Sequence, residues 1–410
     1  MAKIKFSQIR DELNRKHGTN FRSLAEVKKA GFRVVRSRNG EFFLAKEDEL
    51  EPLLIPLGKV AEVRRGFTTG ANEFFYLEPL PYRPICPMCG VVHEEALTKD
   101  EEIAYFSEGK PIPSGKLIAV RNGAGWEGYI EAEFLKPVIK SPREVKTIKI
   151  RPQDLKYRIF MCHKEKHEIE GTHALDYIEW GESAVFVCKK RGCGYRGEEP
   201  YCPKHGDLYI DLDPFPERPT CKSRPRWWDV GMRIPADVNV NYLVDDHMRF
   251  YFSESFKVFV SDNFQEIHSV GAIIAAVSNA LITQLFCELG GRIPFGGGLL
   301  KIQTYEVEKL PVVNHSTFHP VHQNRLLLAF NRMAEREIKS VFEELGLPKP
   351  NRDLSNINPE DVSLDKVMPD RRELDKVIFE VLDLTESEQL EVYKAVVELV
   401  KSRLAKARSV

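Results

Sequence analysis

The sequence predicts an α+β fold: a mainly-β domain around one buried helix, with zinc-knuckle inserts, followed by a helical C-terminal region. Short apolar stretches separated by Pro and Gly fill residues 56–313 and are typical of strands. One longer apolar run, residues 270–289, suits a buried helix. From residue 324 onward, apolar side chains recur at helical spacing. We therefore expect three regions, which are an N-terminal element (1–50), a central domain (51–320) and a helical region (321–410).

The size and composition indicate more than one folded region with a sizeable core. The chain has 410 residues, of which 42% are hydrophobic. The formal net charge is −1, so the chain as a whole is no polycation. Binding to nucleic acid would therefore require the positive charge to be gathered on one face.

Residues 1–50 are expected to form a helix and a basic hairpin. Ser7 is a suitable cap for a helix that ends near Lys16. Residues 32–44 alternate in polarity across Asn39-Gly40, a strong hairpin-turn signal. The arginines of this hairpin (Arg33, Arg36 and Arg38) fit either a solvated edge that resists aggregation or a contact with DNA.

The central domain contains several short strand signals and one apolar helix. The strands are predicted at KLIAV (116–120), RFYFS (249–253), KVFVS (257–261) and LLKIQTYEV (299–307). The apolar run 270–289 is interrupted by Ser278, Asn279, Thr283, Gln284 and Glu288, which favours a core helix over a membrane span. The first residues also lack the apolar run of a signal peptide. We therefore expect a cytoplasmic protein without a membrane partner.

The C-terminal region reads as three amphipathic helices. The first covers residues 324–345 and ends before Gly346 and Pro348. A polar linker, 347–369, separates it from two further helices. Thr385 and Glu388 have the spacing of a capping box between those two. The apolar faces of the last two helices are formed by Leu374, Ile378 and Val381 and by Leu390, Tyr393, Val397 and Val400.

The eight cysteines require an explanation other than disulfides in a cytoplasmic protein. In VCKKRGCGYRGEEPYCPKHG, Cys188 and Cys193 form one pair, and Cys202 and His205 form a second pair. Two such pairs supply the four sulfur and nitrogen ligands of a tetrahedral zinc ion. Because four protein ligands leave no open position, we predict a structural zinc insert near residues 186–207.

A second half-site lies in ICPMCGVVH, where Cys86 and Cys89 form a knuckle within an insert near residues 82–108. His93 is a candidate third ligand. Two alternatives exist for the remaining ligands. They are either among Cys162, His163 and His167, or they come from the 188–205 cluster, in which case the two groups share one metal site. Redox activity is disfavoured because no thioredoxin-like pattern surrounds this pair. Cys287, on the apolar run, reads as a small buried side chain.

Basic and aromatic residues gather in four irregular stretches of the central domain. Charge interleaved with aromatic faces suits phosphate contact combined with base contact or stacking. Each stretch has an alternative, since Trp227-Trp228 also suits a core and Arg64-Arg65 also suits a solvated turn. Gly66 and Gly70 are expected to form turns before a strand at 73–77. The predicted DNA contacts are Arg64, Arg65, Thr68, Thr69, Arg121, Asn122, Lys136, Lys140, Arg143, Arg224, Arg226 and Trp227.

Motifs of common catalytic sites are not found in the sequence. The Gly-rich run at 294–301 follows a helix and enters a strand, the reverse of a dinucleotide-binding turn. The chain has no Pro-Pro pair, no Walker A motif, no HExxH and no GxSxG. Glu337-Ile338-Lys339 has a nuclease-like spacing but lies on the charged face of a predicted helix. We therefore assign no catalytic residue.

Several ordered blocks resemble the target-recognition region of N6-adenine DNA methyltransferases of type II (IIG-like) restriction-modification systems. They span roughly residues 52–407, and the opening block is also similar to type I specificity subunits. The zinc-like inserts look like additions to the common pattern. The blocks are VAEVRRGFTTGANEFFYL (60–77), GWEGYIEAEFLKPVIKSPRE (125–144), LDYIEWGE (175–182), RPRWWDVG (224–231), GGRIPFGGGLLKIQTYEVEKLPV (290–312) and RRELDKVIFEVLDLTESEQLEVYKAVVELVKSRLAKA (371–407).

The resemblance implies sequence-specific binding of double-stranded DNA without methylation by this chain alone. In the family, a catalytic half with glycines for S-adenosylmethionine and an Asn/Asp-Pro-Pro-Tyr motif precedes the recognition region. Here about fifty unrelated residues precede it. S-adenosylmethionine is thus expected only on a separate catalytic subunit, or the chain is a piece of a longer enzyme. The alternatives are an enzyme with an unrecognised site, such as a nuclease or methyltransferase, and a zinc-stabilised module that binds RNA or protein.

Overall fold

The computed structural model describes residues 5–36, 42–46, 52–183, 186–197, 199–254, 256–268, 270–293 and 298–408. Helices account for 38% and strands for 20% of the structure, which confirms the α+β class. The chain forms two compact units, Met1–Ile55 and Pro56–Val410. The helices of residues 321–410 belong to the second unit.

The first unit contains two helices and a hairpin. Leu13, Val27 and Leu44 form its core. The first helix is capped at Lys5 rather than at Ser7, because the Gln8 side chain accepts the Lys5 backbone N–H at 2.7 Å. The predicted Asn39-Gly40 turn lies outside the described residues. The elements are α1 (Phe6–His17), α2 (Leu24–Lys29), β1 (Phe32–Arg36) and β2 (Phe42–Lys46), the two strands being antiparallel.

An antiparallel four-stranded sheet forms one half of the second unit. Its strand order is β15 (Phe250–Phe252), β13 (Val238–Asn241), β17 (Phe264–His268) and β4 (Glu62–Arg65). Strand β4 therefore lies at an edge, with one neighbour in the sheet. The helices α7 (Ala272–Ser278) and α10 (Pro320–Glu335) pack beside this sheet.

The prediction of one helix over 270–289 is wrong, because the run divides into α7 and α8 (Leu281–Gly290), which meet at 63°. Asn279 explains the break. Its side-chain amide donates to the Phe250 carbonyl at 2.8 Å and accepts the Phe250 N–H at 3.1 Å. The Leu281 N–H at the start of α8 donates to Asp375 at 2.8 Å.

Among the described residues, no single helix has the length and apolarity of a membrane span, although the bent pair α7–α8 does by these two criteria.

A six-stranded sheet forms the other half of the second unit. Only β16 and β8 run parallel, and all other neighbours are antiparallel. The expected strand at 73–77 is instead the short helix α3 followed by β5. An aromatic core fills one face, with Phe74 and Tyr177 stacked at a ring distance of 4.5 Å. The order is β16 (Phe259–Val260), β8 (Leu135–Ile139), β9 (Tyr157–Phe160), β5 (Tyr76–Pro79), β6 (Leu117–Arg121) and β7 (Glu127–Glu131).

The remaining elements are mostly short, and the first of them, β3, crosses residue 55, where the first unit ends. The strand predicted at 299–307 is β18 followed by α9. Besides 3-10 turns, these elements are β3 (Leu54–Pro56), α3 (Asn72–Phe75), α4 (Lys99–Ser107), α5 (His173–Glu182), β10 (Phe186–Cys188), β11 (Arg196–Gly197), β12 (Ile210–Leu212), α6 (Pro219–Lys222), β14 (Leu243–Val244), β18 (Leu300–Lys301), α9 (Thr304–Glu308) and β19 (Pro311–Val313).

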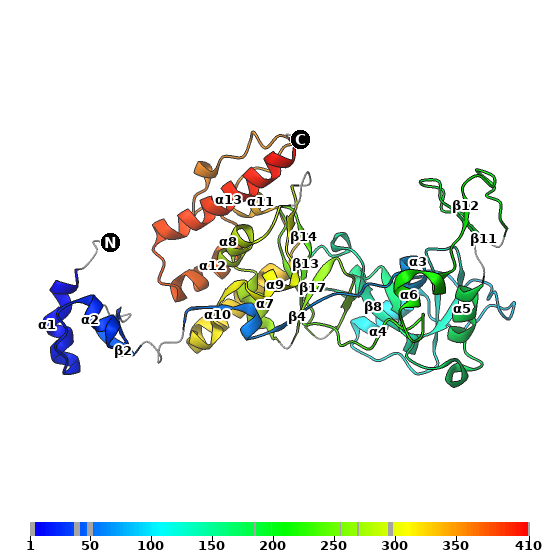
Figure 1. Cartoon of the computed structure of the whole chain (residues 1–410), viewed down its shortest axis with the longest axis horizontal. Coiled ribbons are helices and arrows are strands. Elements are labelled where there is room, and N and C mark those ends of the chain that lie inside the picture. Colours follow the sequence, from blue (N-terminus) through cyan, green and yellow to red (C-terminus); the bar gives the residue numbers. More distant parts are fainter. Residues whose placement is uncertain are drawn as a thin grey trace. The chain divides into compact units, whose positions relative to one another are not determined.

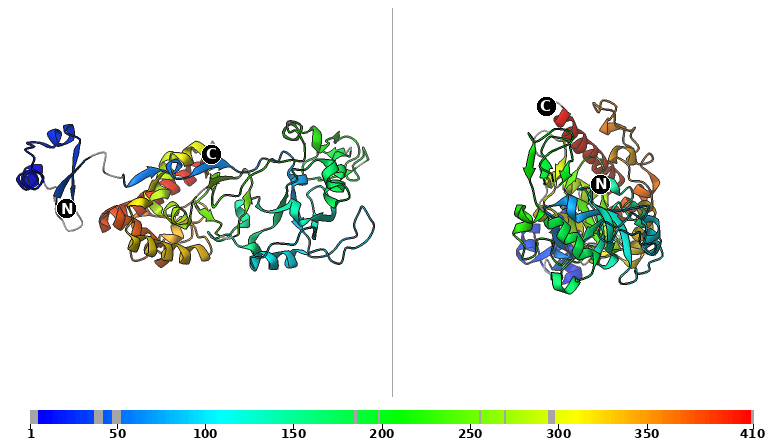
Figure 2. Two further views of the ribbon diagram at one scale, coloured as in Figure 1. Left: turned by 90° about the horizontal axis from the view of Figure 1, so that it is seen from below. Right: turned by 90° about the vertical axis from the view of Figure 1, so that its right-hand side faces the viewer.

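The C-terminal helices cover the four-stranded half of the second unit, away from α5 and the six-stranded sheet (Figures 1 and 2). The predicted helix 324–345 is interrupted at 336–340, and Ser340 caps α11 (Val341–Glu344). Helix α12 (Pro369–Val381) packs on α10, and α13 (Glu386–Arg408) packs on α8. The predicted capping box is confirmed, because the Thr385 N–H and hydroxyl donate to Glu388 at 2.8 and 2.7 Å.

A buried ion network joins these helices to the sheet. Glu344 is 0% exposed and contacts Arg249 beside β15, Arg336 after α10 and Arg371 on α12. Its oxygens lie 3.0 Å from Arg336 and 2.8 Å from Arg371. Burial alone would raise the pKa of Glu344, but the three guanidinium groups outweigh it and hold the pKa at about 2.

Replacement of Glu344 by Gln is expected to lower the free energy of unfolding by about 3–5 kcal/mol, because it leaves buried arginines without their anion. Since the folded pKa lies below the ordinary 4.5, the wild-type contribution is present above pH 4.5 and is lost as pH falls through about 2. Denaturant titrations between pH 4 and 2 should show this loss in the wild type and a flatter profile in E344Q. The neighbouring Glu343→Gln is the control, and an E343Q-like stability for E344Q would contradict the network.

Candidate metal centres and nucleic-acid interface

Cys86, Cys89, His93 and His173 lie together, with all four ligand atoms within 4.8 Å of one another. The turn at Cys86 is closed by its N–H donating to the Val91 carbonyl at 2.8 Å. Cys89 Sγ lies 3.3 Å from His93 Nε2, and the two histidine Nε2 atoms are 3.2 Å apart. The Val91 N–H lowers the pKa of Cys89, which favours the thiolate form of a metal ligand.

Cys188, Cys193, Cys202 and His205 form a second cluster with the same spread of ligand atoms. His205 Nδ1 lies 3.2 Å from Cys193 Sγ and 3.5 Å from the Sγ atoms of Cys188 and Cys202. The Cys193 N–H donates to Lys190, and the Gly206 N–H donates to Cys202, so each cysteine pair sits on a tight turn. The three strands β11-β10-β12 carry this insert.

Both clusters fit a tetrahedral metal ion. Around zinc, tetrahedral geometry separates two nitrogens by about 3.3 Å and two sulfurs by about 3.8 Å. The nitrogen–nitrogen distance of 3.2 Å and the sulfur–nitrogen distances of 3.2 to 3.5 Å lie close to these edges, whereas the Cys193–Cys202 sulfur distance of 3.4 Å is shorter than the zinc edge. With four protein donors, neither cluster leaves a coordination position open for chemistry.

The structure brings two histidines to the Cys86–Cys89 pair. His93 joins the pair as expected, but Cys162, His163 and His167 do not belong to the cluster. His163 instead contacts Asp229 at 2.7 Å. The two clusters are separate rather than shared. His173 was missed because it lies 80 residues from His93, and no local spacing connects them.

Three side chains predicted to contact DNA are buried, which corrects their expected place on an exposed surface. Thr69 donates to Asn72 at 2.5 Å. Asn122 donates to the Tyr177 hydroxyl at 3.0 Å and accepts backbone N–H groups of its own turn. Trp227 lies in the aromatic core, where its indole N–H donates to Glu182 at 2.9 Å.

Arg224 is also turned inward. Its guanidinium donates to the carbonyls of Thr68 and Thr69 at 3.0 and 2.8 Å, and to the Trp227 carbonyl at 3.3 Å. Burial lowers the pKa of Arg224. These three hydrogen bonds hold the 68–69 segment against the chain at Trp227, so Arg224 has a positioning role in this structure.

Arg64 and Arg65 lie on the edge strand β4, with side chains 52% and 48% exposed. Arg64 pairs with Glu62 at 2.6 Å. Arg65 donates to the Asp262 carbonyl at 3.1 Å, and its guanidinium lies 4.5 Å from the centre of the Tyr242 ring. These contacts leave two arginines at an accessible strand edge.

Directly after β4, the backbone at Gly66 lies close to the backbone of Ser261. A Cβ on Gly66 would lie 2.1 Å from the Ser261 carbonyl oxygen, so any side chain there would collide with the backbone. The Phe67 N–H then donates to Val260 at 2.9 Å, which connects β4 to the sheet that contains β16. Gly70 has a φ of +78°, as expected for a turn.

The other predicted basic residues are distributed over the surface. Arg121 pairs with Glu78 at 2.9 Å, and Arg226 pairs with Glu165 and Asp229 at 2.5 and 2.7 Å. Lys140 lies over the rings of Tyr76 and Tyr157, Arg143 is exposed, and Lys136 and Thr68 retain partly or fully exposed side chains. Sequence reasoning missed Arg233, which donates to the Arg65 carbonyl at 2.8 Å and lies between exposed Met232 and Ile234.

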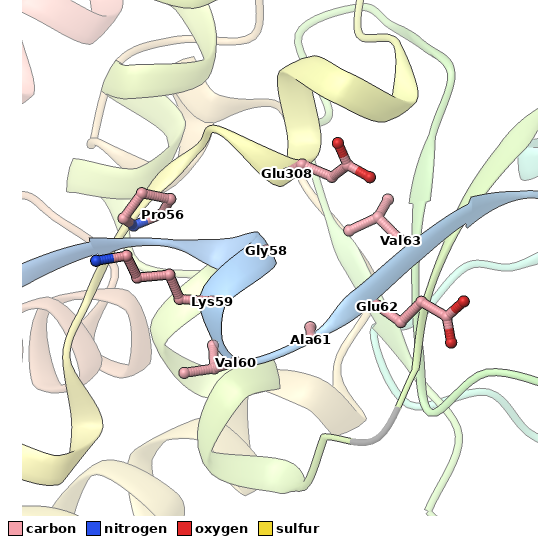
Figure 3. A pocket seen from close by; sticks show the side chains of 8 residues that line it. All are labelled: Pro56, Gly58, Lys59, Val60, Ala61, Glu62, Val63 and Glu308. Atoms are coloured by element: carbon pink, nitrogen blue, oxygen red, sulfur yellow. The ribbon is translucent and has the colours of Figure 1, made fainter.

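A cavity of about 620 Å³ lies beside β4 and is lined by Pro56, residues 58–63 and Glu308. Figure 3 shows that Lys59 and Glu62 point to opposite sides of it. Glu308, from α9, is the only other charged residue of the lining. The lining residues therefore do not converge as acid, base and nucleophile would.

The solved structures similar to the chain include two restriction enzymes of low sequence identity. One is the type IIG restriction endonuclease BpuSI, with 12% identity, a TM-score of 0.43, and coverage of 91% of this chain and 37% of that chain. The other is the type IIL restriction-modification enzyme MmeI in complex with DNA, with 11% identity, a TM-score of 0.39, and coverage of 92% and 42%. This chain thus spans about two fifths of the length of either enzyme. No curated protein matches it.

Residues 211–344 match the family model of the C-terminal domain of the type II methyltransferase M.Eco57I. The match includes Arg224, Arg226, the sheet strands β13, β15 and β17, and the helices α7 to α11. The two cysteine–histidine clusters lie outside it. It confirms, for residues 211–344, the resemblance predicted from the sequence: this segment is similar to the C-terminal domain of the type II methyltransferase M.Eco57I.

Proposed function

We propose that the chain binds double-stranded DNA in a sequence-specific manner, as the target-recognition component of an adenine-N6 DNA methyltransferase or restriction-modification system. The observation that carries this proposal is the match of residues 211–344 to the C-terminal domain of a type II methyltransferase. The solved enzymes named above act in restriction and modification, and one is bound to DNA, which agrees with the proposal.

The edge strand β4 is the best-supported contact with the DNA backbone. Exposed ion pairs contribute little in water, so a phosphate replaces Glu62 beside Arg64 at small cost. Arg65 rests on Tyr242, and the ring limits the orientations of its guanidinium. Further phosphate contacts would come from five basic side chains outside β4, with the Thr68 hydroxyl as a neutral donor. The five are Arg121, Lys136, Lys140, Arg143 and Arg226.

We infer that methyl transfer takes place outside these 410 residues, either on a separate catalytic subunit that binds S-adenosylmethionine or on another part of a longer enzyme. The lack of a Pro-Pro pair in the 410 residues supports this assignment, because the family's catalytic motif contains one. The described part of the chain also offers no convergent acid–base set in its large cavity beside β4. The residues here would select the DNA site and leave the reaction to the partner.

Structural zinc is proposed at Cys188, Cys193, Cys202 and His205. Three sulfurs gathered within 3.2 to 3.5 Å of one nitrogen support zinc, which prefers such donors. The insert is small, with strands of two or three residues, and a metal supplies stability that so small a core lacks.

Replacing both Arg64 and Arg65 by Ala should weaken DNA binding similarly for all sequences, because phosphate contacts carry no sequence information. The slope of log K against log salt should become shallower by about 1.8, or about 0.9 for each lost phosphate contact. Fluorescence anisotropy over a salt series measures this slope. Arg325→Ala with Arg332→Ala, two exposed ion-paired arginines on α10, should leave it unchanged. An equal loss in both double variants would contradict a role for β4.

Calorimetry with S-adenosylmethionine is expected to give no binding heat with this chain alone, because the cofactor belongs to the partner. Adding a methyltransferase catalytic subunit that carries the Pro-Pro-Tyr motif should give a stoichiometric heat. A one-to-one binding isotherm from the isolated chain would show that it contains a cofactor site of its own, and the recognition-only assignment would then be wrong.

Cys202→Ser should remove one zinc ion per chain, since it deletes a sulfur that contacts both Cys193 and His205. Metal analysis by mass spectrometry after gel filtration measures the loss. Cys287→Ala is the matched control, because Cys287 is buried on α8 and lies outside both clusters. Unchanged zinc in C202S would refute this site.

A further inference from the structure

We propose that Cys86, Cys89, His93 and His173 bind a second Zn²⁺ ion, and that this ion fixes the first turn of α5 to the 84–93 loop. The ligands come from a knuckle, its following loop and a helix that begins 80 residues later. The site would therefore be a staple between distant segments, whereas the Cys188 cluster closes a local insert.

The donor geometry supports a Cys₂His₂ tetrahedron. Both histidines present Nε2, at 3.2 Å from each other, and Cys89 Sγ lies 3.3 Å from that of His93. Cys86, with 1% exposure, supplies the fourth donor from the protein side of the turn. Without a metal ion, the two Nε2 atoms of neutral histidines at this distance would either repel each other through their lone pairs or share one proton in a hydrogen bond. A cation between them accounts for all four donors.

The surrounding residues orient the histidines as metal ligands require. Glu131, at the end of β7, lies 3.5 Å from His173 Nδ1 and accepts the backbone N–H groups of His173 and Ala174 at 2.8 and 3.1 Å. Glu95 lies 3.5 Å from His93 Nδ1. A carboxylate on Nδ1 fixes the tautomer whose Nε2 lone pair faces the metal. The Tyr129 ring packs edge-on against His93 at 4.7 Å.

The position of α5 affects two of the segments proposed to contact DNA. Tyr177, one turn after His173, donates its hydroxyl to the Phe74 carbonyl at 2.7 Å and accepts from Asn122 at 3.0 Å. Asn122 follows Arg121, and Phe74 follows the segment that Arg224 holds at Thr68 and Thr69. A staple on α5 would thus keep both segments in place. This second step rests on the proposed DNA recognition, but the metal site itself does not.

Metal content provides the first test. The wild-type chain should carry two zinc ions, His173→Ala one, Cys202→Ser one, and the double variant none. The exposed His167, six residues before His173, is not part of the cluster, so His167→Ala should retain two. Two zinc ions in H173A, or a single ion in the wild type that C202S removes, would overturn the site.

Ligand identity provides a test that does not depend on the folding of H173A. In C202S, X-ray absorption at the zinc edge should show the remaining ion with two sulfurs at about 2.3 Å and two nitrogens at about 2.0–2.1 Å. Three or more sulfurs, or oxygen ligands, would contradict the assignment. Glu131→Gln should weaken zinc binding about 10- to 100-fold in competition with a chelator, as for other carboxylates behind a histidine ligand.

DNA binding tests the second step separately. H173A should bind duplex DNA more weakly than H167A, and added zinc should not restore it. Equal affinity of these two variants would refute the link from α5 to the DNA-contacting segments while the zinc counts still decide the site. If the wild type binds no duplex DNA, the proposed function fails, and the metal analysis remains a complete test of the staple.

Discussion

Glu344 is the contact on which the four-stranded half of the large unit depends. Its carboxylate receives Arg249 from the sheet, Arg336 from the break after α10 and Arg371 from α12. Arg371 also donates to the Asn279 carbonyl at 2.6 Å, and Asp375 accepts the Leu281 N–H. The break between α7 and α8 is therefore satisfied by groups from the C-terminal helices. An ion network of this kind specifies which helix meets which strand, because any other arrangement would leave a buried charge unpaired.

The other half is organised by aromatic stacking and by hydrogen bonds from its polar tips. Phe74, Tyr177 and Trp227 share one core, in which the Tyr177 hydroxyl donates to the Phe74 carbonyl of α3 and the Trp227 indole donates to Glu182 of α5. Trp227, whose position beside two arginines suggested base stacking, is thus part of this core. Under the proposed function, these core residues act on DNA indirectly, by setting where Arg121 and the 64–70 segment lie.

Features that depend on residues close in sequence were predicted correctly, whereas contacts between residues far apart in sequence were not. The Thr385–Glu388 box and the Cys188–His205 pairs depend on neighbours within a few residues, and both recur in the structure as paired groups. The break at Asn279 depends on Phe250 and Asp375, which are far away in sequence. His173 is similar, since only the fold brings it to His93. Trp227 was ambiguous because an aromatic residue beside arginine suits a core and a surface equally.

The near-zero net charge of the chain is compatible with a DNA-binding surface for a structural reason. Several surface arginines among the described residues already have carboxylate partners, as Arg64 has Glu62 and Arg121 has Glu78. Under the proposed function, a phosphate takes the place of such a carboxylate, and the arginine keeps its orientation. At a position where no phosphate replaces it, the carboxylate stays close to the negatively charged DNA and repels it, which disfavours binding there. The same pairs that make the chain neutral would thereby contribute to choosing where it binds.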